Sequence, residues 1–369
     1  MNQTLARRPD DSERIRVIVV DDSAVIRGLI SRMLEGDPRV EVVATCANGQ
    51  AAVQQSARLA PDVVVLDIEM PVMDGLTALP LILQAHPSIS VIMASTLTQR
   101  NAEISMKALA LGATDYLPKP AASVGANEEF RRELLGRVLA LGTRTRGIEL
   151  RSTPGAARIR TASSSVAAPA LRPSAVRPEI VAIGSSTGGP QALFTLTKAL
   201  PRDLGVPVVI TQHMPRTFTA ILAENIARTS GWAAQEATEG ARLLPGHMYV
   251  APGDRHLQLQ RDGTGVVCRI IDTPPENFCR PSVDPMFRSV AQVYGARALC
   301  VMLTGMGQDG LRGSREIVAA GATLIAQDEA TSVVWGMPRA VAEAGLCAAV
   351  LPLPEIAPYV TRTVSGARK

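Results

Sequence analysis

Short apolar runs alternate with amphipathic segments along the first 120 residues of the chain. In Ala24–Leu34 and Gly49–Leu59 the apolar residues recur at helical spacing. Around them lie apolar runs that are typical of buried strands: Ile15–Val20, Val40–Ala44, Val63–Leu66, Val91–Ala94 and Tyr116–Leu117. This alternation predicts a doubly wound α/β domain with a parallel sheet. Ligands of such folds bind at the carboxyl ends of the strands, so the polar residues after each run are candidates for chemistry.

The pattern changes after residue 120. Glu128–Leu141 has helical spacing and is expected to close a first domain spanning residues 14–141. From residue 142 to residue 178, Arg, Ala, Ser, Thr and Pro dominate without an apolar period, which predicts a flexible linker. The β/α alternation then resumes and predicts a second α/β domain with a parallel sheet over residues 179–369.

Four apolar runs predict the strands of this second domain: Ile180–Ile183, Val206–Ile210, Ala298–Leu303 and Thr323–Ala326. Helices are expected to begin at Gln191, Thr217, Leu311 and Pro338. The segment from His247 to His256 is rich in turn residues, and a β-hairpin is expected around Asp262-Gly263. The sequence therefore predicts a parallel sheet with a hairpin insertion.

Charge and composition exclude several classes of function. The 369 residues are 46% hydrophobic and carry a net charge of +4, enough apolar material for two cores. The basic excess lies in residues 121–178, with 10 Lys/Arg against 4 Asp/Glu, and residues 179–369 are nearly balanced, with 17 against 16. A DNA-binding output domain would carry a basic face, so no nucleic-acid partner is expected.

The cysteines and the termini indicate a cytoplasmic protein. Five cysteines are widely spaced and form no C-x-x-C pair, so neither a zinc site nor a disulfide framework is predicted. Cys46 and Cys300 lie in apolar runs and are expected in the core. Residues 1–13 are polar, with no signal-peptide pattern, and no apolar run approaches the roughly 18 residues of a membrane helix. We expect no membrane insertion.

Acidic residues, a serine and a lysine follow the strands of the first domain. Asp21, Asp22 and Asp67 would converge at one sheet edge, where their mutual repulsion favours a bound Mg²⁺ with oxygen ligands. Ser95 and Lys119 would add a hydroxyl and a cation to the same edge, as a phosphate-accepting site requires. Each residue alone could be an ordinary strand-end residue, but five in order disfavour that interpretation.

This set of residues resembles the response-regulator receiver family. The resemblance implies a flavodoxin-like fold, with Asp67 as the phosphoacceptor and Asp21 and Asp22 as metal-binding acids. It also implies that Ser95, Lys119 and the aromatic Tyr116 form the phosphate switch. A histidine kinase would then be the phosphodonor.

A serine in a glycine-rich turn follows the first strand of the second domain. Gly184-Ser185-Ser186-Thr187-Gly188 fits the G-x-S-x-G pattern of a nucleophilic serine on a strand-to-helix turn. The helix that follows Pro190 would point its N-terminus at the site and favour a developing oxyanion. The same glycine-rich segment could instead cradle a phosphate or nucleotide. A Rossmann site would want an acid after the next strand, and Gln212-His213 stands there instead.

A histidine and an aspartate complete a candidate acyl-transfer site. His213 follows the neighbouring strand and is the preferred base, and Asp309, in a glycine-rich loop after another strand, could orient it. His247 and His256 are expected to be surface or hydrogen-bonded residues, with a cleft position as the alternative for His256. The order Ser, His, Asp differs from that of α/β-hydrolases, so an ordinary lipase or esterase is disfavoured.

With a receiver in front, the whole chain resembles the chemotaxis protein-glutamate methylesterase family (CheB). The resemblance implies Ser186 as nucleophile, His213 as base and Asp309 as orienting acid. It further implies an oxyanion hole from Thr187 and Met306. Arg280–Asp284 and Trp335–Pro338 also recur in the family and are expected to line the cleft.

The reaction implied is hydrolysis of glutamyl methyl esters, without a cofactor, on the cytoplasmic domains of chemoreceptors. Deamidation of specific receptor glutamines is implied as well. Two other classes of protein are alternatives. A receiver-controlled binding module would need no nucleophile, and a transcription regulator would need a helix-turn-helix and a basic face, neither of which is apparent.

Overall fold

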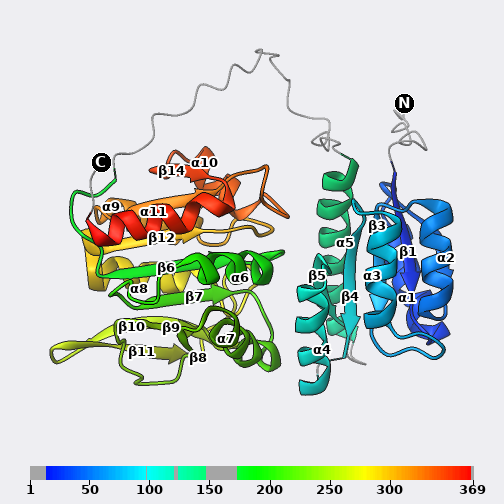
Figure 1. Ribbon diagram of the computed structural model, residues 1–369, viewed down its shortest axis with the longest axis horizontal. Coiled ribbons are helices and arrows are strands. Elements are labelled where there is room, and N and C mark those ends of the chain that lie inside the picture. The colour runs from blue at the N-terminus through cyan, green and yellow to red at the C-terminus, as the bar shows by residue number, and fades with distance from the viewer. Residues whose placement is uncertain (1–13, 97, 120–123, 147–172, 367–369) are drawn as a thin grey trace, which may run out of the picture. The chain divides into compact units, whose positions relative to one another are not determined.

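A computed structural model describes residues 14–96, 98–119, 124–146 and 173–366 (Figure 1). The chain forms two compact units, Met1–Ser152 and Thr153–Lys369. Each unit contains a parallel β-sheet with helices on both of its faces. The predicted α/β class is confirmed for both halves of the chain.

Five parallel strands form the sheet of the first unit, in the order β2-β1-β3-β4-β5. This is the order of flavodoxin-like doubly wound folds. Helices α1 and α5 contact each other on one face, and α2, α3 and α4 lie on the other. The elements are β1 (Ile15–Val20), α1 (Ala24–Glu35), β2 (Val40–Cys46), α2 (Gly49–Leu59), β3 (Val63–Asp67), α3 (Gly75–Ala85), β4 (Ser90–Ser95), α4 (Gln99–Ala110), β5 (Asp115–Pro118) and α5 (Val124–Arg146).

Helix α5 ends five residues later than the sequence predicted, at Arg146 instead of Leu141. Its last turns show no apolar period in the sequence, and contacts with residues far away in the chain hold them in place. Arg146 Nε pairs with the Asp62 carboxylate at 2.7 Å. Gly142 packs so closely on Ile15 that a Cβ there would lie 2.3 Å from its Cγ2. Residues 142–146 therefore belong to this helix and not to the predicted linker.

The far end of the predicted linker belongs to the second unit. Ser174 donates its amide to Thr323 Oγ1 at 2.8 Å, and Arg177 Nε donates to the Val364 carbonyl at 2.7 Å. Residues 173–178 therefore lie along the second unit. The rest of the predicted linker, residues 147–172, lies outside the described residues.

Seven parallel strands form the main sheet of the second unit, in the order β14-β13-β12-β6-β7-β9-β8. The predicted hairpin is confirmed as the antiparallel pair β10 and β11. Helices α6, α7 and α11 lie on one face, and α8, α9 and α10 on the other. The strands are β6 (Ile180–Ser185), β7 (Val208–Gln212), β8 (Ala233–Glu236), β9 (His247–Val250), β10 (His256–Asp262), β11 (Gly265–Ile271), β12 (Ala298–Met302), β13 (Thr323–Gln327) and β14 (Ala349–Leu351). The helices are α6 (Gly189–Ala199), α7 (Arg216–Ser230), α8 (Val283–Tyr294), the 3₁₀ turn η1 (Gly295–Arg297), α9 (Leu311–Ala319), α10 (Met337–Glu343) and α11 (Leu353–Ser365).

Several elements of this unit were not predicted from the sequence. Strands β8, β9 and β14 have only four, four and three residues, too few for an apolar pattern to stand out. Strand β9 lies inside the segment predicted to be rich in turns, yet it pairs in parallel with β7. Helix α8 is buried over most of its length, and Phe287 and Val290 lie in the core beneath the sheet.

Candidate functional sites

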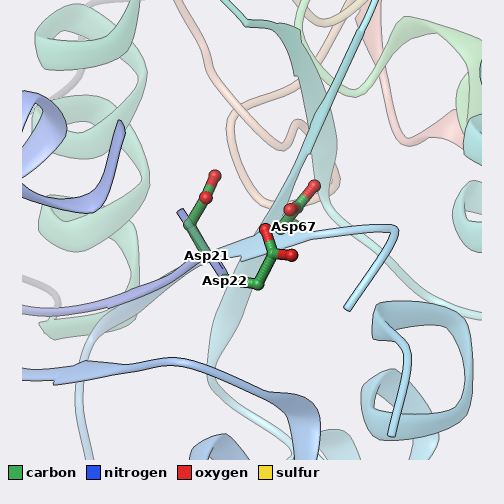
Figure 2. Close-up of side chains that lie close together, drawn as sticks. All are labelled: Asp21, Asp22 and Asp67. Carbon is green, nitrogen blue, oxygen red and sulfur yellow. The ribbon is translucent and has the colours of Figure 1, made fainter. Parts of the chain in front are cut away.

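Three carboxylates converge at the carboxyl edge of the first unit's sheet. Asp21, Asp22 and Asp67 each offer an oxygen, and these oxygens all lie within 4.8 Å of one another (Figure 2). Asp21 and Asp67 are buried and Asp22 is exposed. Lys119 Nζ lies 2.8 Å from Asp21 Oδ2 and 2.7 Å from Asp67 Oδ1. The predicted cluster of acids and lysine is therefore assembled.

The electrostatics of this cluster suit a divalent cation. Burial raises the pKa of Asp67, against the opposing hydrogen bond and charge of Lys119. Burial opposes the charge on Lys119, but its bonds to Asp21 and Asp67 prevail and raise its pKa. Three oxygen donors at one partly open edge match the ligand chemistry of Mg²⁺, whose charge would offset the repulsion among the acids.

The other predicted switch residues lie on β4 and β5, the strands that follow β3 in the sheet. Ser95 is buried, and its Oγ accepts a hydrogen bond from Ser105 Oγ at 3.2 Å. The Lys119 amide donates to the Ser95 carbonyl at 2.7 Å, so these two strand ends are joined. Tyr116 is buried, with only 3% of its surface exposed, and burial raises the pKa of its phenol well above the usual value.

In the second unit, adjacent strands bring the serine and histidine segments together. Strand β6 lies between β12 and β7, and Ser186 and His213 follow β6 and β7 directly. The His213 amide donates to the Ser185 carbonyl at 3.1 Å, and the Ser186 amide donates to the Thr304 carbonyl at 3.0 Å. The loop after β12, which carries Asp309, therefore lies beside the turn that carries Ser186.

The two neighbouring serines have different environments. Ser185 is fully buried, and its Oγ donates to Gln212 Oε1 at 2.6 Å. The Gln212 amide nitrogen in turn donates to the Ser186 carbonyl at 2.9 Å. Ser186 is half-buried and stands just before α6, in a turn where Gly188 adopts φ 74°, a conformation that favours glycine. Solvent and a substrate can therefore reach Ser186 but not Ser185.

His213 and Asp309 form a direct hydrogen bond. His213 Nε2 lies 2.7 Å from Asp309 Oδ2, and the Asp309 side chain is almost completely buried. The carboxylate also accepts hydrogen bonds from Val283 N at 2.6 Å, Ser282 Oγ at 2.6 Å and Asn277 Nδ2 at 2.8 Å. These donors fix both carboxylate oxygens and leave Asp309 one orientation toward the imidazole.

The pKa values of this pair shift in opposite directions. Burial alone would raise the pKa of Asp309, but hydrogen bonds from His213, Ser282 and Val283 outweigh it and lower the value to about 2. Burial opposes the charge on His213, whereas the neighbouring Cys279 and the bond to Asp309 raise its pKa above the usual value. The acid is thus held ionised, and the imidazole is a stronger base than a free histidine.

The segments expected to form the oxyanion hole lie next to Ser186. Thr187 follows it directly, and the Thr187 carbonyl accepts a hydrogen bond from Thr304 Oγ1 at 2.9 Å. Gly305, just before Met306, packs so tightly that a Cβ on it would lie 2.9 Å from the Ser186 Cβ. The amides of Gly336 and Met337 both donate to the Gly305 carbonyl, at 3.0 and 2.8 Å. The expectation that Trp335–Pro338 borders the site agrees with this packing.

The remaining histidines occupy different places. His256 is fully buried, and its Nδ1 accepts a hydrogen bond from the Ser282 amide at 3.1 Å. His256 therefore helps to position Ser282, whose hydroxyl donates to Asp309. His247 stacks on Tyr249, with ring centroids 6.3 Å apart. Sequence reasoning missed Asn277 and Cys279, and only their nearness to Arg280–Asp284 could have drawn attention to them. The cysteines expected in the core, Cys46 and Cys300, are buried.

Two family models match the chain. The CheB methylesterase model matches residues 181–360, and the response regulator receiver model matches residues 17–126. A protein-glutamate methylesterase/protein-glutamine glutaminase of Azospirillum brasilense is 54% identical over 96% of this chain and 93% of its own length. A protein of the same name from Paramagnetospirillum magneticum is 52% identical over 95% and 96%. The chain belongs to this family.

A solved structure supports the fold of the second unit. The CheB methylesterase catalytic domain of Thermotoga maritima is 40% identical, with a TM-score of 0.50, and covers 51% of this chain and 99% of its own. The family relationship confirms the two predicted kinds of domain, a receiver followed by a methylesterase-type domain. Within the described residues, no helix is long and apolar enough to cross a membrane.

Proposed function

We propose that this chain hydrolyses glutamyl methyl esters on the cytoplasmic domains of chemoreceptors, with Ser186 as nucleophile, His213 as base and Asp309 as orienting acid. The observation that carries the proposal is the 2.7 Å bond between His213 Nε2 and the buried Asp309 carboxylate, beside a half-buried serine. The family membership supports the same substrate class, since the relatives are named for it.

In the proposed reaction Asp309 accepts a hydrogen bond from the Nε2–H of His213, and the other ring nitrogen, Nδ1, takes the Ser186 proton. Ser186 Oγ then attacks the ester carbonyl, and the backbone N–H groups of Thr187 and Met306 stabilise the oxyanion. Protonation by His213 releases methanol and leaves an acyl-enzyme. Water deprotonated by His213 hydrolyses this intermediate to the glutamate carboxylate. Deamidation of a glutamine follows the same path with ammonia as the leaving group.

The first unit would control this activity through phosphorylation of Asp67 by a histidine kinase. Asp21, Asp22 and Asp67 are the residues that would hold Mg²⁺, and the ion supplies positive charge for the phosphoryl oxygens. Lys119 would hold a further phosphoryl oxygen, and the new charge would draw in Ser95 and Tyr116.

We propose that the receiver domain spans residues 14–146 and that the catalytic domain begins at residue 179. We also propose that the protein is cytoplasmic.

The experiment that tests this function measures methanol release from a methylated receptor cytoplasmic fragment. The wild-type chain should release methanol, and a small-molecule phosphodonor with Mg²⁺ should raise the initial rate. A chain that binds the fragment but releases no methanol would instead be a binding module, the alternative that needs no nucleophile.

A further inference from the structure

A strained turn joins the candidate catalytic residues to the surface of the second unit. Residues 276–279 form it, and it is closed by two backbone bonds, from Glu276 N to Cys279 O at 3.2 Å and from Cys279 N to Glu276 O at 2.9 Å. Its central residues, Asn277 and Phe278, have φ values of 52° and 64°. Non-glycine residues seldom adopt this left-handed conformation, and for a bulky aromatic it is a clear outlier. Such strain persists only where the surroundings hold it.

Asn277 supplies the anchor that holds the turn. Its Nδ2 donates to Asp309 Oδ1 at 2.8 Å and to Asp284 Oδ2 at 2.9 Å, so one amide group bridges two buried carboxylates. At the other end of the turn, Cys279 adjoins His213. The turn is therefore fixed to both members of the His213–Asp309 pair, and its tip has a defined position beside them.

Phe278 occupies that tip and is largely exposed. Its exposed fraction is 75%, the highest of any large apolar residue in the described part of the second unit. A single exposed apolar residue is ordinary, but this one is held outward in a strained conformation, and aromatic residues, Phe included, are enriched where proteins contact partners.

The degree of burial of Ser186 determines which part of a substrate would lie near Phe278. Because Ser186 is only half-buried, the ester at the end of a glutamyl side chain can reach it while the substrate backbone stays at the surface. The flanking residues of a protein substrate would then lie on the surface near the His213–Asp309 pair, which the turn that carries Phe278 contacts through Asn277 and Cys279. A free single-residue ester would have nothing to contact there.

We propose that Phe278 is a specificity residue that contacts the apolar side chains flanking the esterified glutamate of the protein substrate. The inference rests on the proposed function and deepens it, because it names the contact that separates a protein substrate from a small ester. Asn277 is a positioning residue in this arrangement, since it acts through the turn and through Asp309.

The test compares two substrates with the full-length chain: a methylated receptor fragment and N-acetyl-glutamate γ-methyl ester. Phe278→Ala should lower kcat/KM for the receptor fragment about tenfold through a higher KM, equivalent to about 1.4 kcal/mol, while turnover of the small ester is retained. Phe278→Leu should recover most of the loss because it restores an apolar side chain. Leu244→Ala, which truncates another exposed apolar residue of the same unit, should change neither substrate.

Three outcomes would overturn the inference. An equal loss on both substrates would mean that Phe278 acts on the geometry of the catalytic residues, and no loss on either would mean that it makes no substrate contact. A rise in small-ester turnover without phosphodonor would assign Phe278 to a contact within the chain itself. Failure of the proposed function looks different, because the wild-type chain would then release methanol from neither substrate.

Discussion

His213 meets Asp309 through Nε2, at 2.7 Å from the Oδ2 of a carboxylate that is almost completely buried. In the serine proteases the acid binds Nδ1 and the nucleophile lies at Nε2. The imidazole of this chain is turned the other way, so in the proposed mechanism Nδ1, on the side of the ring away from Asp309, would take the Ser186 proton. The roles are the same because either nitrogen can carry the proton when its partner fixes the tautomer.

Replacing Asp309 by asparagine should reduce kcat by about 10³–10⁴-fold, with a small effect on KM. An amide cannot stabilise the imidazolium, and its NH₂ group would face donors such as the Val283 amide. Steady-state methanol release measures the effect, and circular dichroism checks that the fold is retained. Turnover at the wild-type level would remove Asp309 from the catalytic residues.

The pH dependence of turnover should report the raised pKa of His213. A base must be neutral to accept the Ser186 proton, so kcat/KM should rise with pH. The apparent pKa of this ascending limb should lie above the ordinary histidine value of about 6.5. Cys279 contributes to the raised value, so Cys279→Ser should move this limb to lower pH. A matched control is Cys268→Ser, because Cys268 lies in the core of the same unit.

The same pair links stability to pH. The pKa of His213 is raised in the folded chain, so the protonated imidazole stabilises the folded state. This stabilisation is fully present below the unfolded pKa of about 6.5 and is lost as the pH rises through the folded pKa. Thermal melts of the wild-type chain should therefore show Tm falling on the alkaline side, and a His213→Gln variant should show a weaker fall. Identical alkaline slopes for the two proteins would contradict this linkage.

Asp67→Asn should make methanol release insensitive to a phosphodonor, because the amide cannot form the acyl phosphate. Asp74→Asn is the control, since Asp74 caps helix α3 through its side-chain oxygen and asparagine keeps that bond. A chelator should have the same effect as Asp67→Asn if the three carboxylates hold Mg²⁺. Continued phosphodonor activation of Asp67→Asn would place the phosphorylation site elsewhere.

Control by the receiver also predicts the result of removing it. Each unit contains a complete candidate site, and the sequence between residues 147 and 172 has the composition of a flexible linker. If the unphosphorylated receiver occludes the catalytic site, deletion of residues 1–146 should raise basal turnover and abolish the phosphodonor response. A tenfold change needs only about 1.4 kcal/mol of differential stability. A truncated chain no more active than the unphosphorylated whole would favour activation by recruitment or direct contact.

The parts of the fold that the sequence predicts are those with long-range apolar patterns. Strands such as β1 and β12 are continuous apolar runs, and the chemistry-bearing residues follow them directly, so the sheet edge can be inferred from the sequence. Short strands such as β9 depend on the neighbour with which they pair, and no local pattern marks them. The end of α5 depends likewise on a distant ion pair between Arg146 and Asp62.

The same distinction applies to the candidate site. Ser186, His213 and Asp309 lie in glycine-rich or polar segments next to apolar strands, which is a local signal. Asn277 acquires its importance only because the fold brings it to Asp284 and Asp309. A lone asparagine in a turn carries no such information in the sequence.

The most direct measurement is the initial rate of methanol release from a methylated receptor fragment by the matched variants Ser186→Ala and Ser185→Ala. Ser186→Ala should lose roughly 10⁴–10⁶-fold in rate, because it removes the nucleophile. Ser185→Ala should retain most activity, since the Ser185 hydroxyl is occupied by its bond to Gln212. Near-normal turnover by Ser186→Ala, together with an inactive Ser185→Ala variant, would contradict the assignment of Ser186 as the nucleophile and with it the account of this site.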